Sequence, residues 1–198
     1  MSDLFQVIYL TGAPAAGKSS VAERLIQAIT PLEVFNYGQE FTKYLSEKIK
    51  REVQQDKVRG ESARLITPED VASMDRILME KVRTLRTRTH FMIDTHAVTK
   101  EDYGFRVTPF SLQQFAELRP TMIVVLYTSP DVAINRISDD PGGRPMITAF
   151  ESGLHTAMQA SVALSYGTSL GLPVYFLDGD KPIDEIVAWF QQRVDGNT

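Results

Sequence analysis

Hydrophobic residues recur along this chain with two alternating spacings. Short apolar runs, rich in β-branched and aromatic residues, predict five strands near residues 4–10, 32–37, 91–94, 122–127 and 173–177. Between these runs, apolar residues repeat every three or four positions and predict helices near residues 18–29, 41–53, 68–88, 111–118, 130–137, 148–169 and 183–194. Strands that alternate with helices predict a doubly wound α/β fold, with a mostly parallel five-stranded sheet and helices on both faces.

Two stretches lack either spacing. Residues 95–109 contain Gly104 and Pro109, and we interpret them as one long loop of functional character. Residues 138–145 are dense in turn-forming residues and predict a mobile segment. By contrast, Thr67-Pro68-Glu69-Asp70 has the hydroxyl cap, the proline and the carboxylates of a helix start.

Composition narrows the possible partners. A chain of 198 residues is expected to form a single domain, residues 1–198. Its net charge of −4 gives no overall electrostatic reason to bind nucleic acid or membranes, and the basic cluster at residues 81–88 fits the carboxyl end of a helix. The absence of cysteine excludes disulfides, thiolate zinc sites and a cysteine nucleophile. No apolar run approaches ~20 residues and the first residues lack a basic flank, so we expect a cytoplasmic protein.

One segment carries a specific chemical motif. Gly12-Ala13-Pro14-Ala15-Ala16-Gly17-Lys18-Ser19 fits the P-loop pattern G-x-x-x-x-G-K-[ST], between a predicted strand and a predicted helix. The glycines let backbone N–H groups surround phosphate oxygens, and the helix presents its positive end to the same anion. Lys18 places a cation on the β- and γ-phosphates, and the Ser19 hydroxyl is suited to Mg²⁺. We therefore predict that residues 12–19, together with Ser20, bind ATP and Mg²⁺.

A carboxylate and a histidine follow another predicted strand. Asp94 ends the apolar run at 91–94 and fits the position that holds Mg²⁺, directly or through water; its alternative is a helix cap or turn residue. His96 either orients the acceptor or is a hydrogen-bonded structural histidine, and the sequence leaves both open.

Three arginines are candidates for contacts with phosphate. Arg136 precedes the turn-rich segment and Arg144 lies within it. Together they suggest a lid at about residues 138–147 that closes over the phosphates. The alternative is two surface arginines. Arg64, before the helix that starts at Pro68, could bind the phosphate of an acceptor.

These residues together resemble the archaeal-type adenylate kinases. The P-loop, Asn36-Tyr37-Gly38, Asp94-Thr95-His96, the segment 103–109 and Ser165-Tyr166-Gly167 occur in the same order as in that family. The resemblance implies a P-loop kinase sheet with a short arginine-bearing lid, ATP at the P-loop and Mg²⁺ near Ser19 and Asp94. It also implies a nucleoside monophosphate in a second pocket, formed by Tyr37, Gly38, the segment of about 38–66 and the loop after Asp94. Members are often homotrimers, so the resemblance allows a homo-oligomer.

The chain departs from the family at three places. Ala15 and Ala16 stand in the P-loop where glycine and valine are frequent, and the lid carries fewer arginines. The segment 104–109 is bulkier and more polar than in the family, and its Arg106 could contact an extra phosphate or an acidic group of the acceptor.

We therefore expect an Mg²⁺-dependent kinase that transfers the γ-phosphoryl group of ATP to a nucleotide, with AMP as the expected acceptor. Lys18 stabilises the transferred group, Ser19 and Asp94 hold the metal, and Arg136 and Arg144 close over the charge. An acceptor phosphate is already an oxyanion, so no general base is required. The alternatives are a kinase of a small hydroxyl-bearing metabolite, with Asp94 or His96 as base, and a regulatory nucleotide-binding ATPase. A kinase of nucleic-acid 5′ ends is disfavoured by the acidic pI, but the arginine cluster at residues 83–88 leaves this alternative open.

Overall fold

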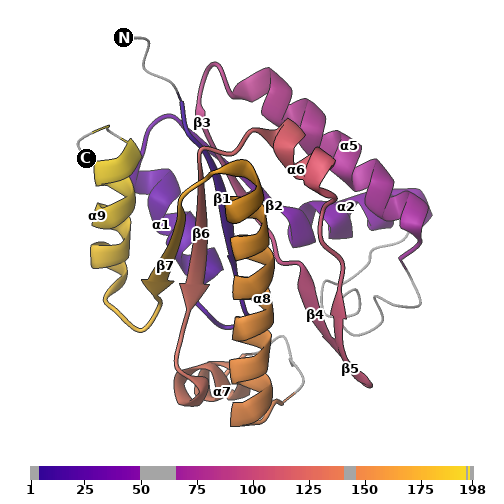
Figure 1. Cartoon of the computed structure of the whole chain (residues 1–198), viewed down its shortest axis with the longest axis vertical. Coiled ribbons are helices and arrows are strands. Elements are labelled where there is room, and N and C mark those ends of the chain that lie inside the picture. The colour runs from indigo at the N-terminus through magenta and orange to yellow at the C-terminus, as the bar shows by residue number, and fades with distance from the viewer. Residues whose placement is uncertain (1–4, 50–65, 141–145, 195, 197–198) are drawn as a thin grey trace.

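A five-stranded sheet lies at the centre of the structure, a computed structural model that describes residues 5–49, 66–140, 146–194 and 196 (Figure 1). Its strands follow the order β2-β3-β1-β6-β7, and every neighbouring pair is parallel. Their bounds are β1 Val7–Gly12, β2 Leu32–Asn36, β3 His90–Asp94, β6 Met122–Tyr127 and β7 Val174–Asp178. The predicted doubly wound α/β fold is confirmed.

The central strands are buried on both faces. All six residues of β1 are buried, and so are nearly all residues of β3 and β6. Continuous apolar runs suit such strands, because helices cover both sides of a parallel sheet. The strands β2 and β7, which lie at the two edges, contain fewer buried residues.

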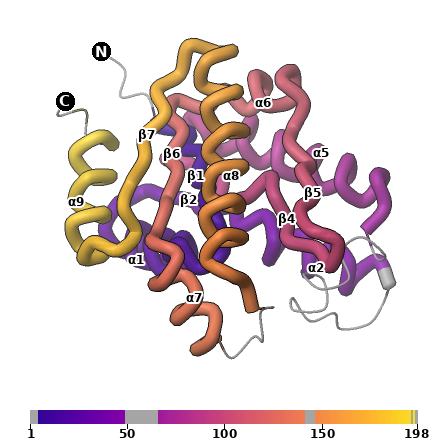
Figure 2. The backbone as a smooth tube through the Cα atoms, turned by 60° about the horizontal axis from the view of Figure 1, so that its bottom comes forward, coloured from indigo at the N-terminus to yellow at the C-terminus, as the bar shows by residue number. Residues whose placement is uncertain are grey.

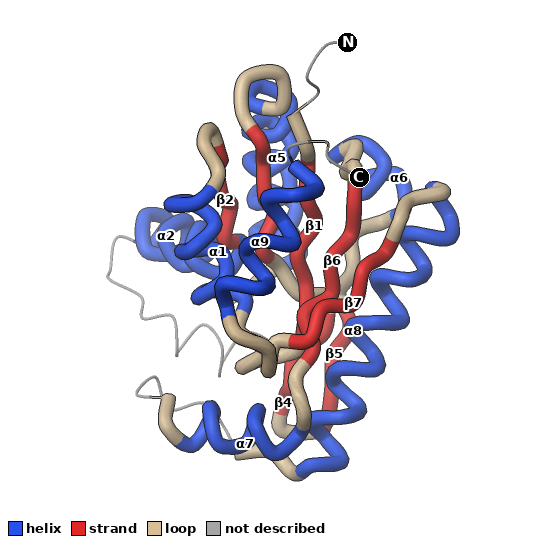
Figure 3. Tube along the Cα trace, turned by 90° about the vertical axis from the view of Figure 1, so that its left-hand side faces the viewer, coloured by secondary structure: helices blue, strands red, loops and turns tan. Residues whose placement is uncertain are grey.

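Helices cover the two faces of the sheet unequally. The side chains of Ile8 and Leu10 pack under α1 and α9, whereas those of Val7 and Tyr9 pack under α2, α5, α6 and α8 (Figures 1 and 3). The helices are α1 Lys18–Ala28, α2 Tyr37–Ile49, α5 Pro68–Leu85, α6 Leu112–Leu118, α7 Pro130–Ser138, α8 Ala149–Leu170 and α9 Ile183–Val194. In the described part of the chain, no helix has both the length and the hydropathy needed to cross a bilayer.

The prediction of one long loop at residues 95–109 was wrong. This segment contains an antiparallel hairpin, β4 Val98–Glu101 and β5 Gly104–Val107, joined by the two residues Asp102 and Tyr103. Cross-strand contacts stabilise it: Arg106 forms an ion pair with Glu101 at 2.9 Å, and the Lys100 ammonium lies over the Phe105 ring. Strands of four residues are too short for their alternation to be seen in the sequence.

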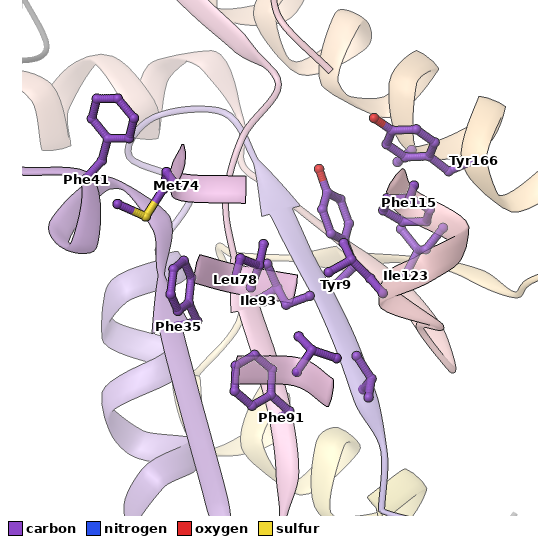
Figure 4. Packing of buried hydrophobic residues seen from close by; sticks show 14 of the residues in the cluster. Tyr9, Phe35, Phe41, Met74, Leu78, Phe91, Ile93, Phe115, Ile123 and Tyr166 are labelled. Atoms are coloured by element: carbon purple, nitrogen blue, oxygen red, sulfur yellow. The ribbon is translucent and has the colours of Figure 1, made fainter. Parts of the chain in front are cut away.

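Aromatic rings fill the space between β1, α6 and α8. The ring of Phe115 stacks on Tyr166, with centroids 3.8 Å apart and planes at 6° (Figure 4). Tyr9 meets both rings edge to face. Because Phe115 is fully buried in this cluster, it fixes α6 and α8 against the sheet.

We expect Phe115→Ala to lower the free energy of unfolding by about 3–5 kcal/mol, because the truncated side chain leaves a cavity among rigid rings. Phe150→Ala is the matched control, since Phe150 is 76% exposed on α8, and its effect should stay within about 0.5 kcal/mol. Urea denaturation followed by circular dichroism measures both. Equal midpoints for the two variants would contradict this view of the core.

Candidate active site

A cleft of about 1070 Å³ opens at the carboxyl edge of the sheet. In Figure 2 this edge is turned towards the viewer, with α7 and the β4–β5 hairpin beside it. Open α/β sheets bind ligands at this edge. The P-loop, the ends of β2 and β3, the hairpin and parts of α5 and α7 contribute residues to its wall.

The P-loop has the backbone geometry of an anion cradle. Gly17 precedes α1 with a left-handed φ of 94°, and Ala15 has a φ of 63°. Gly12 has a φ of 151°, and a Cβ there would lie 2.2 Å from the Leu126 carbonyl oxygen. Residues 14–20 line the cleft, so the amino end of α1 faces it. Such a helix end supplies N–H donors and a positive dipole to an anion.

Lys18 is tied to the loop that precedes it. Its ammonium donates to the carbonyl oxygens of Gly12 at 2.7 Å and of Ala13 at 3.3 Å. Gly12 and Ala13, which were predicted to bind the nucleotide, therefore hold the lysine rather than line the cleft. The predicted Ser19 and Ser20 are exposed at the start of α1, in the cleft wall.

Asp94 ends β3 and lies in the cleft wall, between the neighbouring strands β1 and β2. Sheet register pairs it with Leu10 of β1 and with Asn36 of β2. The amide nitrogen of Asn36 donates to its carboxylate at 2.7 Å. Burial raises the pKa of Asp94. The charge of Lys18 and the hydrogen bond from Asn36 partly lower this pKa again. A carboxylate is thus held beside the phosphate-binding loop.

The residues present fit a magnesium ion that is bound mainly by phosphate and water. In the ranges that the structure describes, no cluster of three or more histidine, aspartate, glutamate or cysteine side chains could hold a metal by itself. Mg²⁺ usually takes one or two protein oxygens besides phosphate and water. The Ser19 hydroxyl and the Asp94 carboxylate, both in the cleft wall, supply such oxygens.

Arg136 joins α7 to the rim of the P-loop. Its guanidinium donates to the carbonyl oxygens of Ala15 at 3.0 Å and of Gly179 at 3.1 Å. The arginine therefore brings a positive charge to the P-loop side of the cleft. Arg144 and Arg64 lie outside the described residues, as do residues 141–145 of the predicted lid and residues 50–65 of the predicted acceptor segment.

The predicted acceptor residues Tyr37, Gly38, His96 and Arg106 all line the cleft. Their side chains differ in environment: His96 is exposed, whereas Arg106 is paired with Glu101 inside the hairpin. The ion pair with Glu101 partly balances the charge of Arg106 before any ligand binds. The Tyr37 hydroxyl donates to the buried Asp75 at 2.8 Å.

Sequence reasoning missed Asn36 and Asp75 as individual site residues. Asn36 was quoted only as part of a resemblance, although it ends a parallel strand, where ligands bind. Asp75 stands at a buried position of the helical repeat of Val71, Leu78 and Val82, and a carboxylate at such a position is a signal in itself.

A buried polar cluster on α8 was also missed. Gln159, which is 1% exposed, accepts from the Ala97 backbone N–H at 3.2 Å and from the Thr11 hydroxyl at 3.5 Å. His155 contacts the Val98 carbonyl oxygen through Nε2 at 3.0 Å, and burial lowers the pKa of this imidazole. These bonds join β1, just before the P-loop, to the segment that follows Asp94.

We expect Gly179→Ala to weaken ATP binding by about tenfold or more, because a Cβ would lie 2.4 Å from the Ala16 carbonyl oxygen and would displace the P-loop. Gly153→Ala is the control, since a Cβ there meets nothing within 4 Å. Isothermal titration calorimetry gives both dissociation constants. Unchanged affinity in the first variant would show that the loop tolerates the displacement.

The chain is similar to a known protein family and to individual kinases. Residues 11–151 match the model of the AAA domain family AAA_17. The adenylate kinase of Methanococcus vannielii is 22% identical over 92% of this chain and 96% of its own length. That of Methanopyrus kandleri is 24% identical over 95% and 97%, respectively. The similarity to archaeal adenylate kinases therefore extends over nearly the whole chain.

Solved structures show the same architecture. An unliganded sugar kinase from Janibacter superposes with a TM-score of 0.56 and 15% identity, covering 96% of this chain and 95% of its own. A chain of the Pnkp1/Rnl/Hen1 RNA repair complex superposes with a TM-score of 0.54 and 15% identity, covering 82% of this chain and 46% of its own. At such identities these structures establish the fold alone. With the family match over residues 11–151, they show that this chain belongs to the AAA_17 family of AAA domains and has a P-loop kinase fold.

Proposed function

We propose that this protein transfers the γ-phosphoryl group of ATP to a nucleoside monophosphate, with AMP as the expected acceptor. The observation that carries the proposal is the single cleft that joins the P-loop to a pocket with aromatic walls, with Asp94 in its lining. Distant similarity to adenylate kinases over nearly the whole chain supports it.

The P-loop end of the cleft takes the donor. The N–H groups at the start of α1 bind its phosphates, and Lys18 exchanges its contacts with carbonyl oxygens for phosphate oxygens. Arg136 adds a second cation on the rim. Ser19 and Asp94 would hold Mg²⁺, which neutralises phosphate charge when bound.

The other end takes the acceptor. Tyr37, Phe41 and Phe110 line it, and aromatic rings suit the face of a nucleobase. The reacting phosphate of a nucleotide is an oxyanion at neutral pH, so the site needs no base to remove a proton. Catalysis then depends on aligning the two substrates and on stabilising the negative charge of the transferred phosphoryl group. P-loop kinases stabilise that charge mainly through cations. We further propose that Arg64 binds the acceptor phosphate and that Arg144 closes over the transferred group.

A hydroxyl-bearing acceptor is the second candidate. It is favoured by Asp94, because burial raises the pKa of this carboxyl and makes it a better proton acceptor. In that case Asp94 would accept the proton of the hydroxyl during transfer.

A coupled ADP-release assay with ATP and Mg²⁺ tests the proposal against a panel of nucleoside monophosphates and a control without acceptor. Strong stimulation by AMP is the expected result. Turnover that depends on no monophosphate, but rises with a sugar or another alcohol, would favour the second candidate. ADP release that no acceptor changes would indicate a regulatory ATPase.

Lys18→Ala should lower kcat by about a hundredfold or more, because the transferred phosphoryl group loses its main cation. Arg24→Ala, an exposed change on the same helix that removes only an ion pair with Asp184, should stay near the wild-type rate. Single-turnover kinetics with saturating ATP measures both. A rate for Lys18→Ala within tenfold of wild type would contradict the assignment of the P-loop.

Asn36→Ala should shift the acidic limb of the kcat–pH profile to higher pH. The Asn36 amide lowers the pKa of Asp94, so without this donor the carboxyl protonates at a higher pH. Because protonated Asp94 cannot hold the metal, the rate falls earlier as the pH decreases. Superimposable acidic limbs for wild type and variant, with both proteins folded by circular dichroism, would contradict this role.

A further inference from the structure

The acceptor end of the cleft contains a carboxylate that the proposed phosphoryl transfer does not use. Asp75 lies on α5, is 7% exposed, and lines the cleft. Its Oδ1 accepts the Tyr37 hydroxyl proton at 2.8 Å, and its Oδ2 accepts from the Gln114 side-chain amide at 3.2 Å. Both partners are neutral, so they orient the carboxylate without balancing its charge.

A second buried carboxylate on the same helix provides a contrast. Asp70 forms an ion pair with Lys48 at 2.5 Å and closes the capping box with Thr67, and it is not part of the cleft wall. Within the part of the chain that the structure describes, Asp75 has no such ion pair. The capping box and the ion pair with Lys48 account for the burial of Asp70, whereas none of the described residues forms an ion pair with Asp75.

The carboxylate of Asp75 retains the capacity to bind a donor. Each carboxylate oxygen can accept about two hydrogen bonds, and each oxygen of Asp75 accepts one from the protein. A ligand that enters the cleft can supply the others. Since a carboxylate only accepts, it favours an N–H or O–H group and repels a carbonyl oxygen.

Two further aromatic rings pack on Tyr37, the tyrosine that donates to this carboxylate, and such rings favour a planar ligand. The rings of Tyr37 and Phe41 lie 6.0 Å apart at 15°, and Phe110 meets Tyr37 at 6.1 Å and 76°. All three residues line the cleft together with Asp75. A flat base among such rings presents its edge, where its donors and acceptors lie.

Two consecutive residues connect this carboxylate with the proposed site of phosphoryl transfer. Asn36 bonds to Asp94, which lies beside Lys18, and Tyr37 bonds to Asp75. The cleft therefore has one carboxylate near a cation and the phosphate-binding loop, and another among rings and neutral donors. A nucleoside monophosphate has the same polarity, with an anionic phosphate at one end and a base at the other.

From this arrangement we propose that Asp75 determines the specificity for the acceptor by accepting a hydrogen bond from the exocyclic amino group of its base. The inference rests on the proposed function. It restricts the acceptor to nucleotides whose base carries an amino group, such as AMP and CMP. IMP and UMP, which present a carbonyl oxygen at the corresponding position, are disfavoured because that oxygen faces a carboxylate.

The test compares kcat/KM for AMP with that for IMP, and for CMP with that for UMP, in wild type and in Asp75→Asn. The wild type should prefer the amino-bearing member of each pair by about tenfold to a hundredfold, the effect expected for one hydrogen bond to a charged group. Asp75→Asn keeps the shape, and its amide can donate to a carbonyl oxygen. The AMP-to-IMP ratio should therefore fall by about tenfold or more, with KM for ATP within about twofold of wild type.

The control is Glu80→Gln, the same change of charge at an exposed position of α5. It should leave both ratios unchanged, because the exposed Glu80 side chain is remote from the base of the acceptor. A merely structural effect of Asp75→Asn would lower the rates for AMP and IMP together and would leave their ratio unchanged. A ratio that Asp75→Asn leaves unaltered overturns the proposal.

The comparison of kcat/KM between amino-bearing and carbonyl-bearing acceptors in the wild type tests the proposal even if Asp75→Asn does not fold. Turnover with monophosphates but without preference for the amino-bearing member overturns the role of Asp75 and leaves the proposed function intact. No turnover with any monophosphate contradicts the proposed function itself.

Discussion

The parallel pairing of β3 between β1 and β2 is the constraint on which the cleft depends. In that register Leu10, Asn36 and Asp94 lie side by side, and the P-loop begins two residues after Leu10, beside the carboxylate and its amide partner. The cost of burying Asp94 is partly offset by the hydrogen bond from Asn36 and by the charge of the nearby Lys18. A shift of one residue would turn these side chains to the opposite faces of their strands.

Helix α8 extends this constraint to the hairpin. Gln159 and His155 provide hydrogen-bond partners for the backbone of Ala97 and Val98 at the start of β4, and buried backbone groups need such partners. The same helix contributes Tyr166 to the aromatic cluster with Phe115. One helix thus packs against the sheet through the Tyr166 ring and contacts the segment after Asp94 through the Gln159 amide and the His155 imidazole.

The cleft separates two kinds of chemistry along its length. At one end, backbone amides, Lys18 and Arg136 favour anions. At the other end, rings and the carboxylate of Asp75 favour a flat ligand that donates hydrogen bonds. This distribution of charge and rings suits a ligand with an anionic end and a planar end.

The sequence alone predicted the five strands of the central sheet, the helices that the structure describes and the P-loop, because periodicity and motif spacing depend on near neighbours in the chain. It also placed Asp94 at a strand end. It did not predict the β4–β5 hairpin, whose contacts run between short strands, or the roles of Asn36, Asp75 and Gln159. Only tertiary structure decides these, because each acts through a partner that is distant in the chain: Asp94 is 58 residues from Asn36, Tyr37 is 38 from Asp75, and Ala97 is 62 from Gln159.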